Sequence, residues 1–107
     1  MNDINQKKWY VYMVRCEDNS LYTGITTDVV RRFEEHKSGR GAKYTKNRKP
    51  LKIEIVFQTN NRSEASKLEY FIKNFSKKEK ENKILDEKNK KFFIIEAENR
   101  LNIKINL

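Results

Sequence analysis

The sequence has few of the residues that build extracellular scaffolds or membrane spans. It contains one cysteine, one proline and three glycines in 107 residues. Because Cys16 stands alone, an internal disulfide is impossible, and a disulfide-stabilised extracellular fold is excluded. Residues 1–8 are polar, and no later run approaches the about 20 apolar residues of a membrane span. We therefore expect a cytoplasmic protein with no membrane partner.

The charge of the chain is strongly positive. The sequence has 24 Lys and Arg against 15 Asp and Glu, a net charge of +9, which attracts polyanions and makes nucleic-acid binding salt-dependent. AT-rich coding also raises the Lys and Asn content, so charge alone does not identify a partner. Position is more informative, because nine positive residues lie between positions 31 and 52, where only Glu34 and Glu35 oppose them. The nine are Arg31, Arg32, Lys37, Arg40, Lys43, Lys46, Arg48, Lys49 and Lys52.

Length and composition indicate one folded domain. Hydrophobic residues make up 36% of the chain, and one Trp, five Tyr and six Phe supply more bulk than a disordered chain of this charge carries. Trp9–Cys16 is apolar and aromatic, residues 17–20 are turn formers, and residues 21–25 are apolar again, which predicts a β-hairpin. Residues 51–59 alternate in polarity and predict a third strand.

A short helix and an exposed loop are expected between the second and third strands. Asp28 and the two threonines before it offer capping oxygens to a helical pattern over residues 29–37, which ends at Ser38 and Gly39. Residues 39–50 contain two glycines, the only proline and five basic residues without clear periodicity. This segment is typical of an exposed loop.

Two capping patterns predict the later helices. Asn61 with Glu64 resembles a capping box before the main core helix, and Ser76 with Glu79 repeats it at the start of a highly charged segment. The core helix carries an apolar stripe at helical spacing, formed by Ala65, Leu68, Ile72 and Phe75. In the charged segment, Ile84 and Leu85 are the only evident core contacts. The apolar tail, residues 92–107, predicts one more packed element of unassigned type.

Together these patterns predict an α+β fold with a three-stranded, mainly antiparallel sheet flanked by helices. Residues 1–8 are expected to form an N-terminal extension and residues 9–85 the domain. Residues 86–107 are expected to be a C-terminal extension that packs on it.

Two tyrosines are expected to meet on one face of the hairpin. Side chains alternate along a strand, so Tyr10 and Tyr12 share a face of the first strand, and Tyr22 and Gly24 share a face of the second. Gly24 leaves room for a backbone or a ligand to approach closely. Taken alone, either tyrosine is more often a packing residue with a hydrated hydroxyl.

A cation, an imidazole and a carboxylate accompany the tyrosines. Arg32 and His36, four positions apart on the first helix, project from one face and can reach the same phosphate. Glu69 flanks the apolar stripe, where its carboxylate would be partly shielded from water. A bound metal cation would offset the cost of that shielding. Each has an alternative: Arg32 as a solvated helix residue, His36 as a solvated surface residue, and Glu69 as a partner of Lys73.

In order and spacing, these residues resemble the GIY-YIG nuclease family, in its branch of small stand-alone bacterial proteins (UPF0213-like) related to the first domain of the UvrC repair subunit. Residues 10–12 (Tyr-Val-Tyr) stand at the first tripeptide, and residues 22–24 (Tyr-Thr-Gly) stand at the second. Tyr10, Val11 and Thr23 replace a glycine and two isoleucines. The resemblance runs from about position 9 to about position 80 and includes residues 41–45 (Gly-Ala-Lys-Tyr-Thr), a hallmark of this branch.

The resemblance implies a GIY-YIG fold and metal-dependent hydrolysis of phosphodiester bonds, with Tyr12, Tyr22, Arg32, His36 and Glu69 as catalytic residues. Glu69 matches the family's metal-binding glutamate and would hold a single, weakly bound Mg²⁺ or Mn²⁺. Tyr22 is the candidate base, and Tyr12 would orient the water or a phosphate oxygen. Arg32 would neutralise phosphate charge, and His36 would contact phosphate or assist proton transfer.

One family residue lacks a clear counterpart. The asparagine that often follows the metal-binding glutamate has Asn82 as its nearest candidate, which keeps open a module that binds nucleic acid without cutting it. A second alternative is a protein–protein adaptor that uses the apolar tail from Phe92.

The expected partner is nucleic acid, in the first place DNA. Seven residues supply cations and one stacking ring for its backbone: Arg31, Arg40, Lys43, Tyr44, Lys46, Arg48 and Lys49. Such contacts give affinity without sequence specificity. Target choice is therefore expected to depend on substrate structure or on a protein partner.

Overall fold

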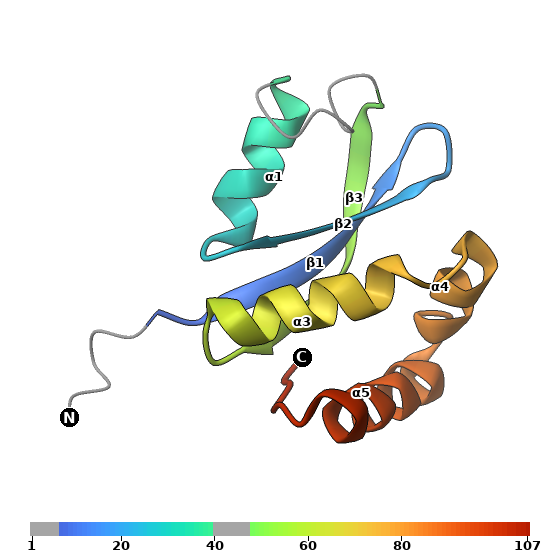
Figure 1. Cartoon of the computed structure of the whole chain (residues 1–107). Coiled ribbons are helices and arrows are strands. Elements are labelled where there is room, and N and C mark those ends of the chain that lie inside the picture. The colour runs from blue at the N-terminus through green and yellow to red at the C-terminus, as the bar shows by residue number, and fades with distance from the viewer. Residues whose placement is uncertain (1–6, 40–47) are drawn as a thin grey trace.

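The computed structural model describes residues 7–39 and 48–107. Its described residues form one antiparallel sheet in the order β2-β1-β3, with four helices around it (Figure 1). The strands are β1 (Trp9–Cys16), β2 (Leu21–Thr26) and β3 (Pro50–Thr59), and the helices are α1 (Val29–Lys37), α3 (Arg62–Lys73), α4 (Lys77–Lys83) and α5 (Glu87–Leu101). The predicted α+β class and three-stranded sheet are confirmed.

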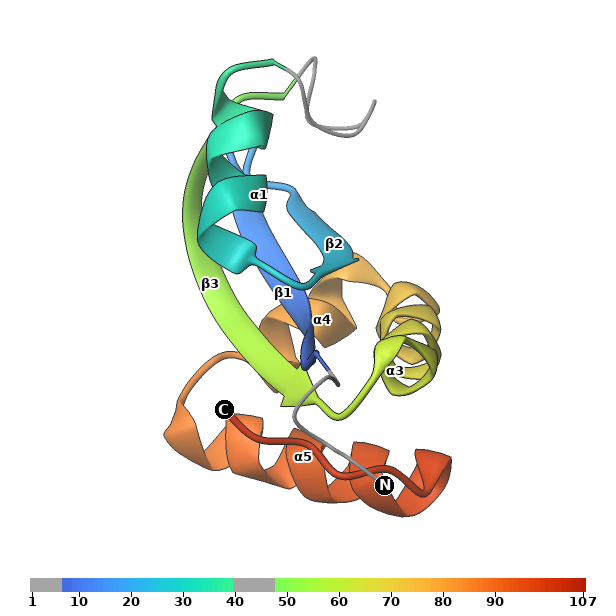
Figure 2. The same ribbon diagram turned by 90° about the vertical axis from the view of Figure 1, so that its left-hand side faces the viewer.

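The central strand β1 is buried on both of its faces. Val11 and Met13 belong to the larger core, which α3 and α5 cover. Tyr12 and Val14 point the other way, into a smaller core that is covered by α1. Figure 2 shows α1 on one side of the sheet and α5 across the opposite end, with α3 beyond the β2 edge. Alternation along one strand thus separates a structural face from the face that carries the tyrosines.

Strand β3 changes face part-way along its length. Its pairing with β1 shifts register between Met13 and Val14, so that Glu54 is the extra residue between Ile53 and Ile55. Ile53 therefore packs in the smaller core while Ile55 packs in the larger one. Simple alternation over residues 51–59 does not reveal this, because a bulge adds one residue to the period.

The helix starts follow the capping residues in the sequence. Asp28 accepts a hydrogen bond from the Arg31 backbone N–H, and Asn61 accepts one from Glu64. Ser76 and Glu79 form a complete capping box. The helix α1 ends at Lys37, with Ser38 as its C-cap before Gly39, whose φ is 83°. These predictions are confirmed because caps depend on neighbours in the chain.

The C-terminal residues form a helix and a short returning segment. Phe93 of α5 is 2% exposed. Its ring centroid lies 5.6 Å from that of Phe57, 6.1 Å from that of Phe71 and 6.0 Å from that of Phe75. After α5, Asn106 pairs with Gln58 at the outer edge of β3.

The expected core contact of Leu85 is wrong, because that side chain is 69% exposed. Ile84 does pack against the larger core. Within residues 7–39 and 48–107, no helix combines the length and apolar character that crossing a membrane requires.

Candidate functional site

The hairpin register brings the two tyrosines together. Tyr12 pairs with Gly24 and Val14 pairs with Tyr22, so the tyrosines lie diagonally on one face with ring centroids 6.3 Å apart. A Cβ at Gly24 would lie 2.6 Å from the Tyr12 hydroxyl oxygen and 2.8 Å from Tyr12 Cζ. The space above Gly24 is therefore filled by the Tyr12 ring and not left open for a ligand. Any side chain at position 24 would collide with that ring.

His36 lies beneath both tyrosines. It is 1% exposed, its Nε2 is 3.0 Å from the Tyr12 hydroxyl, and its ring meets Tyr22 edge-on at 5.3 Å. Burial lowers the pKa of His36, and the charge of Arg32 lowers it further, so the imidazole is neutral at pH 7. With the proton on Nδ1, Nε2 accepts a hydrogen bond from Tyr12. The alternative of a solvated surface histidine is wrong.

Arg32 lies one helical turn before His36 on α1. Its Nη1 donates to Glu35 Oε1 at 2.8 Å, and the guanidinium lies close enough to the Tyr12 hydroxyl to act against the rise in the pKa of that phenol. Its side chain is 28% exposed, so the fully solvated alternative does not apply. The guanidinium is thus held between a carboxylate and a phenol, with part of its surface open to an anion.

Glu69 comes to the cluster from α3, which packs against β1 and β2. Its side chain is 22% exposed, and its Oε2 lies 3.1 Å from Lys73 Nζ. The carboxylate is close enough to raise the pKa of both Tyr12 and Tyr22 electrostatically. The ion pair with Lys73, which was the alternative interpretation of Glu69, is therefore present. Glu69 also lies near the two tyrosines.

Both tyrosines are phenols rather than phenolates at neutral pH. Burial raises the pKa of Tyr12 to about 12, with a further contribution from Tyr22. Burial also raises the pKa of Tyr22, while Lys73 and Arg32 act in the opposite direction. The protein alone thus favours two hydroxyl groups that can donate hydrogen bonds.

Residues 8–92 match the family model described as the GIY-YIG catalytic domain. This chain belongs to the GIY-YIG family. The matched span contains both tripeptides, α1 and Glu69. GIY-YIG proteins form a nuclease family that acts on nucleic acid and generally depends on divalent metal ions.

Several relatives of this GIY-YIG protein are small bacterial proteins. The UPF0213 protein FN1575 of Fusobacterium nucleatum is 50% identical over 97 residues, which are 91% of this chain and 94% of that protein. A UPF0213 protein of Cupriavidus necator is 51% identical over 72 residues, 67% of this chain and 78% of that protein. The solution NMR structure of the UPF0213 protein BH0048 from Bacillus halodurans is 44% identical and covers 69% of this chain and 79% of its own, with a TM-score of 0.45.

The donor set of this GIY-YIG site fits a weakly held divalent ion. Mg²⁺ commonly takes one or two carboxylates and completes its shell with waters and substrate phosphates. Glu69 is a partly exposed carboxylate beside two phenol oxygens, which suits that pattern. Among residues 7–39 and 48–107, no three His, Cys, Asp or Glu side chains gather into a protein-only metal site.

Three of the seven residues predicted to bind nucleic acid are described. Arg31 is paired with Glu35 at 2.8 Å, Arg48 is paired with Asp18 at 2.8 Å, and Lys49 is exposed. The other four, Arg40, Lys43, Tyr44 and Lys46, lie outside the described residues.

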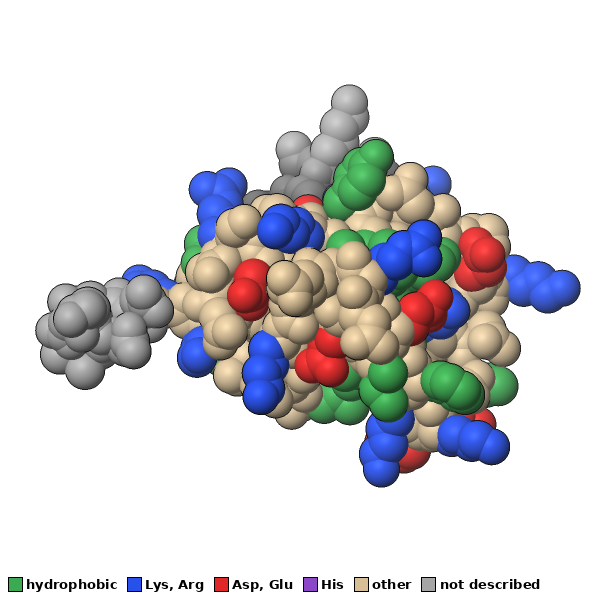
Figure 3. Space-filling view, turned by 60° about the horizontal axis from the view of Figure 1, so that its bottom comes forward, with side chains coloured by type: hydrophobic (Ala, Val, Ile, Leu, Met, Phe, Trp, Pro, Cys, Tyr) green, Lys and Arg blue, Asp and Glu red, His purple; other side chains and the backbone are tan. Residues whose placement is uncertain are grey.

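On the face seen in Figure 3, Lys and Arg side chains alternate with Asp and Glu and surround several hydrophobic side chains. The positive charge of that face is therefore dispersed.

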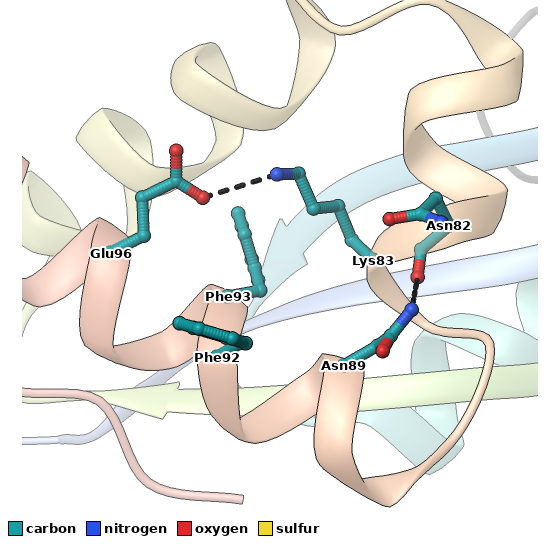
Figure 4. A pocket seen from close by; sticks show the side chains of 6 residues that line it. All are labelled: Asn82, Lys83, Asn89, Phe92, Phe93 and Glu96. Carbon is teal, nitrogen blue, oxygen red and sulfur yellow. Dashed lines mark hydrogen bonds and ion pairs between the residues drawn. The ribbon is translucent and has the colours of Figure 1, made fainter.

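Asn82 lies at the junction of α4 and α5. It lines a pocket there with Asn89, Phe92 and Glu96, and its backbone carbonyl accepts a hydrogen bond of 2.7 Å from Asn89 Nδ2 (Figure 4). These neighbours come from α5 rather than from the tyrosine cluster. Asn82 is thus not among the residues that gather around Tyr12.

Sequence reasoning missed two parts of the site. Glu35 orients Arg32, and the i,i+3 spacing of the two residues was a signal for that pair. Lys73 was treated only as a partner of Glu69, although its charge also acts on Tyr22. The effect of Lys73 on Tyr22 depends on how α3 packs on β2, which no local sequence pattern reports.

Proposed function

We propose that this chain is a divalent-metal-dependent endonuclease that hydrolyses phosphodiester bonds in DNA or in structured nucleic acid. The observation that carries the proposal is the gathering of four functional groups around the Tyr12 hydroxyl: His36 Nε2 at 3.0 Å, the Arg32 guanidinium, the Tyr22 phenol and the Glu69 carboxylate. A purely structural tyrosine does not need a cation, a carboxylate and an imidazole at its hydroxyl.

The proposed base is Tyr22, which is more exposed than the almost fully buried Tyr12. In hydrolysis, the oxygen of water bonds to phosphorus while the bond from phosphorus to the leaving oxygen breaks. The proton of the water passes to Tyr22, which must first have released its own phenol proton to solvent, and the leaving oxygen takes up a proton from solvent water. Burial raises the pKa of Tyr22, and the charges of Lys73 and Arg32 act against that rise, which eases formation of the phenolate.

Tyr12 and His36 are proposed to act as a unit. With the His36 proton on Nδ1, the Tyr12 hydroxyl donates a hydrogen bond to His36 Nε2, and its oxygen can still accept hydrogen bonds from other donors. The Tyr12 oxygen can thus orient a water by accepting its hydrogen bond. With 1% exposure, His36 is expected to act through Tyr12 rather than to contact the phosphate itself.

Arg32 and Glu69 are proposed to manage the charge of the substrate. The guanidinium neutralises negative charge on the non-bridging phosphate oxygens. Glu69 would hold the Mg²⁺ or Mn²⁺, which when bound supplies Lewis-acid polarisation of the phosphoryl group. Lys49, Arg31 and Arg48, with the basic residues at positions 40–46, would bind the backbone of the nucleic acid.

A module that binds nucleic acid without cutting it is the second candidate. The position of Asn82 favours it, since this nearest counterpart of the family asparagine faces α5. In that case the tyrosine cluster would bind a phosphate and leave it intact.

The two candidates are separated by cleavage assays on labelled branched, nicked and single-stranded DNA and RNA, with Mg²⁺ or Mn²⁺ and with EDTA. Glu69→Ala and Arg32→Ala should abolish divalent-dependent cutting. Glu17→Ala and Arg100→Ala, both at exposed positions away from the cluster, are the matched charge controls and should cut normally. Binding at low salt without cutting by the wild type would replace the nuclease with the binding module.

A further inference from the structure

An open pocket lies between the start of β1 and the start of α1. Its volume is about 460 Å³. Its lining consists of three cations, one carboxylate, one hydroxyl side chain and one aromatic ring: Lys7, Lys8, Arg31, Asp28, Thr27 and Tyr10. Figures 1 and 2 both show the start of β1 below the first turn of α1. Because three positive charges stand against one negative charge, the pocket attracts an anion.

Tyr10 supplies the aromatic ring of this pocket, and core packing does not account for its position. Its side chain is half-buried, yet it belongs neither to the larger core nor to the smaller one. Within residues 7–39 and 48–107, its hydroxyl makes no hydrogen bond and its ring contacts no other ring or cation. A ring beside a cationic pocket suits a nucleotide, because the base stacks on the ring while the phosphate pairs with the cations.

The two lysines of the pocket are not neutralised by carboxylates. The Lys8 ammonium donates to the neutral amide oxygen of Asn60 at 2.9 Å. Across the part of the chain that the structure describes, neither Lys7 nor Lys8 has an Asp or Glu partner. Both side chains are exposed. Their ammonium groups can therefore turn towards a phosphate without breaking an ion pair.

Glu35 joins the pocket to the tyrosine cluster. Its Oε2 accepts a hydrogen bond from Arg31 Nη1 at 2.8 Å, and its Oε1 accepts one from Arg32 Nη1 at 2.8 Å. Arg31 lines the pocket, and Arg32 is the cation of the cluster. One carboxylate thus holds a guanidinium of each site, so the two sites are neighbours on the surface of α1.

The spacing along β1 fits two positions on one nucleic-acid strand. Tyr10 and Tyr12 stand two residues apart on the same face of β1, which is about 7 Å along the strand. Two successive base steps of a nucleic-acid strand cover a similar length, at about 3.4 Å each. A strand that presents one phosphate to Arg32 can therefore place a nucleotide one or two positions away in the pocket.

We propose that Tyr10, Lys7, Lys8 and Arg31 form a nucleotide-binding subsite beside the tyrosine cluster, in which a base stacks on Tyr10 and its phosphate pairs with the cations. The inference rests on the proposed function for its substrate, a nucleic-acid strand. The subsite positions the strand and takes no part in bond breaking. Since every base has a face that stacks, the subsite selects unpaired nucleotides without reading their sequence.

The ring is tested by the affinity of the full chain for two probes in EDTA, so that no cutting occurs. One probe is a single-stranded DNA oligonucleotide, and the other is an abasic sugar-phosphate strand of the same length. Tyr10→Ala should weaken binding of the oligonucleotide at least about 5-fold, the lower end for one lost base stack, and leave binding of the abasic strand unchanged. Tyr10→Phe keeps the ring and should restore the affinity. Equal weakening with both probes, or with neither, would overturn the stacking on Tyr10.

The cations are tested by the salt dependence of the same affinities. Lys7→Gln/Lys8→Gln should lower the slope of log K against log salt with either probe, by about 0.7 for each lost contact to a single strand. Lys88→Gln is the matched control, because Lys88 is an exposed lysine of α5, outside the pocket, without a carboxylate partner among the described residues. Its slope should equal that of the wild type. A double variant with the slope of Lys88→Gln would overturn the phosphate contact.

The outcomes separate this inference from the nuclease proposal. A wild type that cuts DNA, with Tyr10→Ala and Lys7→Gln/Lys8→Gln binding both probes as the wild type does, overturns the subsite and leaves the nuclease. The expected losses of affinity and slope, in a protein that never cuts, support the subsite and remove the nuclease. Absence of any DNA binding overturns both.

Discussion

Thr23 occupies the middle of the second tripeptide, where the family has isoleucine. Its side chain is 2% exposed on the face of the larger core, and its Oγ1 is buried without a hydrogen-bond partner among the described residues. A buried polar atom that loses its water without gaining a partner costs about 1–3 kcal/mol. This residue is therefore a source of instability beside the site.

Thr23→Val, which keeps the shape and removes the hydroxyl, should stabilise the protein by about 1 kcal/mol in urea unfolding. Thr26→Val is the matched control. Thr26 Oγ1 accepts a hydrogen bond of 3.1 Å from the Asp28 backbone N–H at the start of α1, so its loss should destabilise by a similar amount. A destabilised Thr23→Val protein would mean that the hydroxyl has a partner.

His36 should make stability depend on pH in a window that it alone controls, since it is the only histidine in the chain. Its pKa in the folded protein is lowered by burial, below the ordinary value of 6.5. The unfolded chain therefore binds more protons, and stability falls as pH drops from about 6.5 towards the lowered folded pKa. Urea unfolding between pH 7.5 and 5 should reveal this loss, and His36→Asn should reduce it. An equal loss in His36→Asn would contradict the account.

The sequence was sufficient to predict that the two tyrosines share a face and that Arg32 and His36 share another, but not how deeply these side chains are buried. Alternation along two strands placed Tyr12 and Tyr22 on one face, and helical spacing placed Arg32 beside His36. The burial of His36 depends on how α1 packs on the sheet, and the position of Asn82 depends on how α5 packs on α4. Both are contacts between distant segments, which periodicity does not encode.

At the scale of elements, Phe93 is the buried aromatic side chain of α5 that contacts the larger core. Phe93 contacts Phe57, Phe71 and Phe75, which belong to β3, α3 and the residues just after α3. Phe93→Ala should destabilise by about 3–5 kcal/mol, the usual cost of a large cavity in a core. The neighbouring Phe92 is 69% exposed, so Phe92→Ala should change stability by about 0.5 kcal/mol or less. Equal effects in urea unfolding would contradict the packing described for α5.

Arg15 connects β1 to α4 and to β3. Its Nε is 2.9 Å from Glu54 Oε2, and its Nη2 is 2.8 Å from Glu81 Oε1, with 16% of the side chain exposed. Arg15→Met should destabilise by about 2 kcal/mol, because two partly buried carboxylates lose their partner. Lys77→Gln, which removes a 51% exposed partner of Glu81, should cost under about 1 kcal/mol.

The ion pairs of Arg15 with Glu54 and Glu81 also make stability depend on pH. The Arg15 hydrogen bond lowers the pKa of Glu81 to about 2. This depressed pKa contributes stability that is present above the ordinary glutamate value and is lost as pH falls from about 4.5 towards 2. In Arg15→Met that loss should shrink, and the window is separate from that of His36.

Local signals specified most elements, and long-range packing decided the others. The caps at Asp28, Asn61 and Ser76 predicted three helix starts, because a cap needs only a neighbouring backbone N–H. The type of the last element was not assigned, because residues 92–95 are all apolar and fit neither a helical nor a strand period clearly. Phe93 and Ala97 are buried with helical spacing, and Phe92 and Ile95 remain exposed.

For the whole molecule, the sheet separates the larger core from the face that carries the tyrosine cluster. The larger core, on the side of Val11 and Met13, carries α3 and α5, while Tyr12 and Tyr22 face α1 on the other side. Glu69 reaches the tyrosines from α3, close to the β2 edge. The candidate site therefore uses four separate elements, β1, β2, α1 and α3, and its geometry is fixed only when these have packed together.

The central claim is that the Tyr12 hydroxyl organises a nuclease site, and single-turnover cleavage by Tyr12→Phe tests it most directly. Phenylalanine keeps the ring above Gly24 and removes only the oxygen that meets His36 Nε2. We predict that the cleavage rate of Tyr12→Phe is at least about 100-fold lower than that of the wild type, and that its thermal stability is retained. Tyr70→Phe, at a 73% exposed position of α3, should cut at the wild-type rate. Wild-type cleavage by a folded Tyr12→Phe protein would contradict the account.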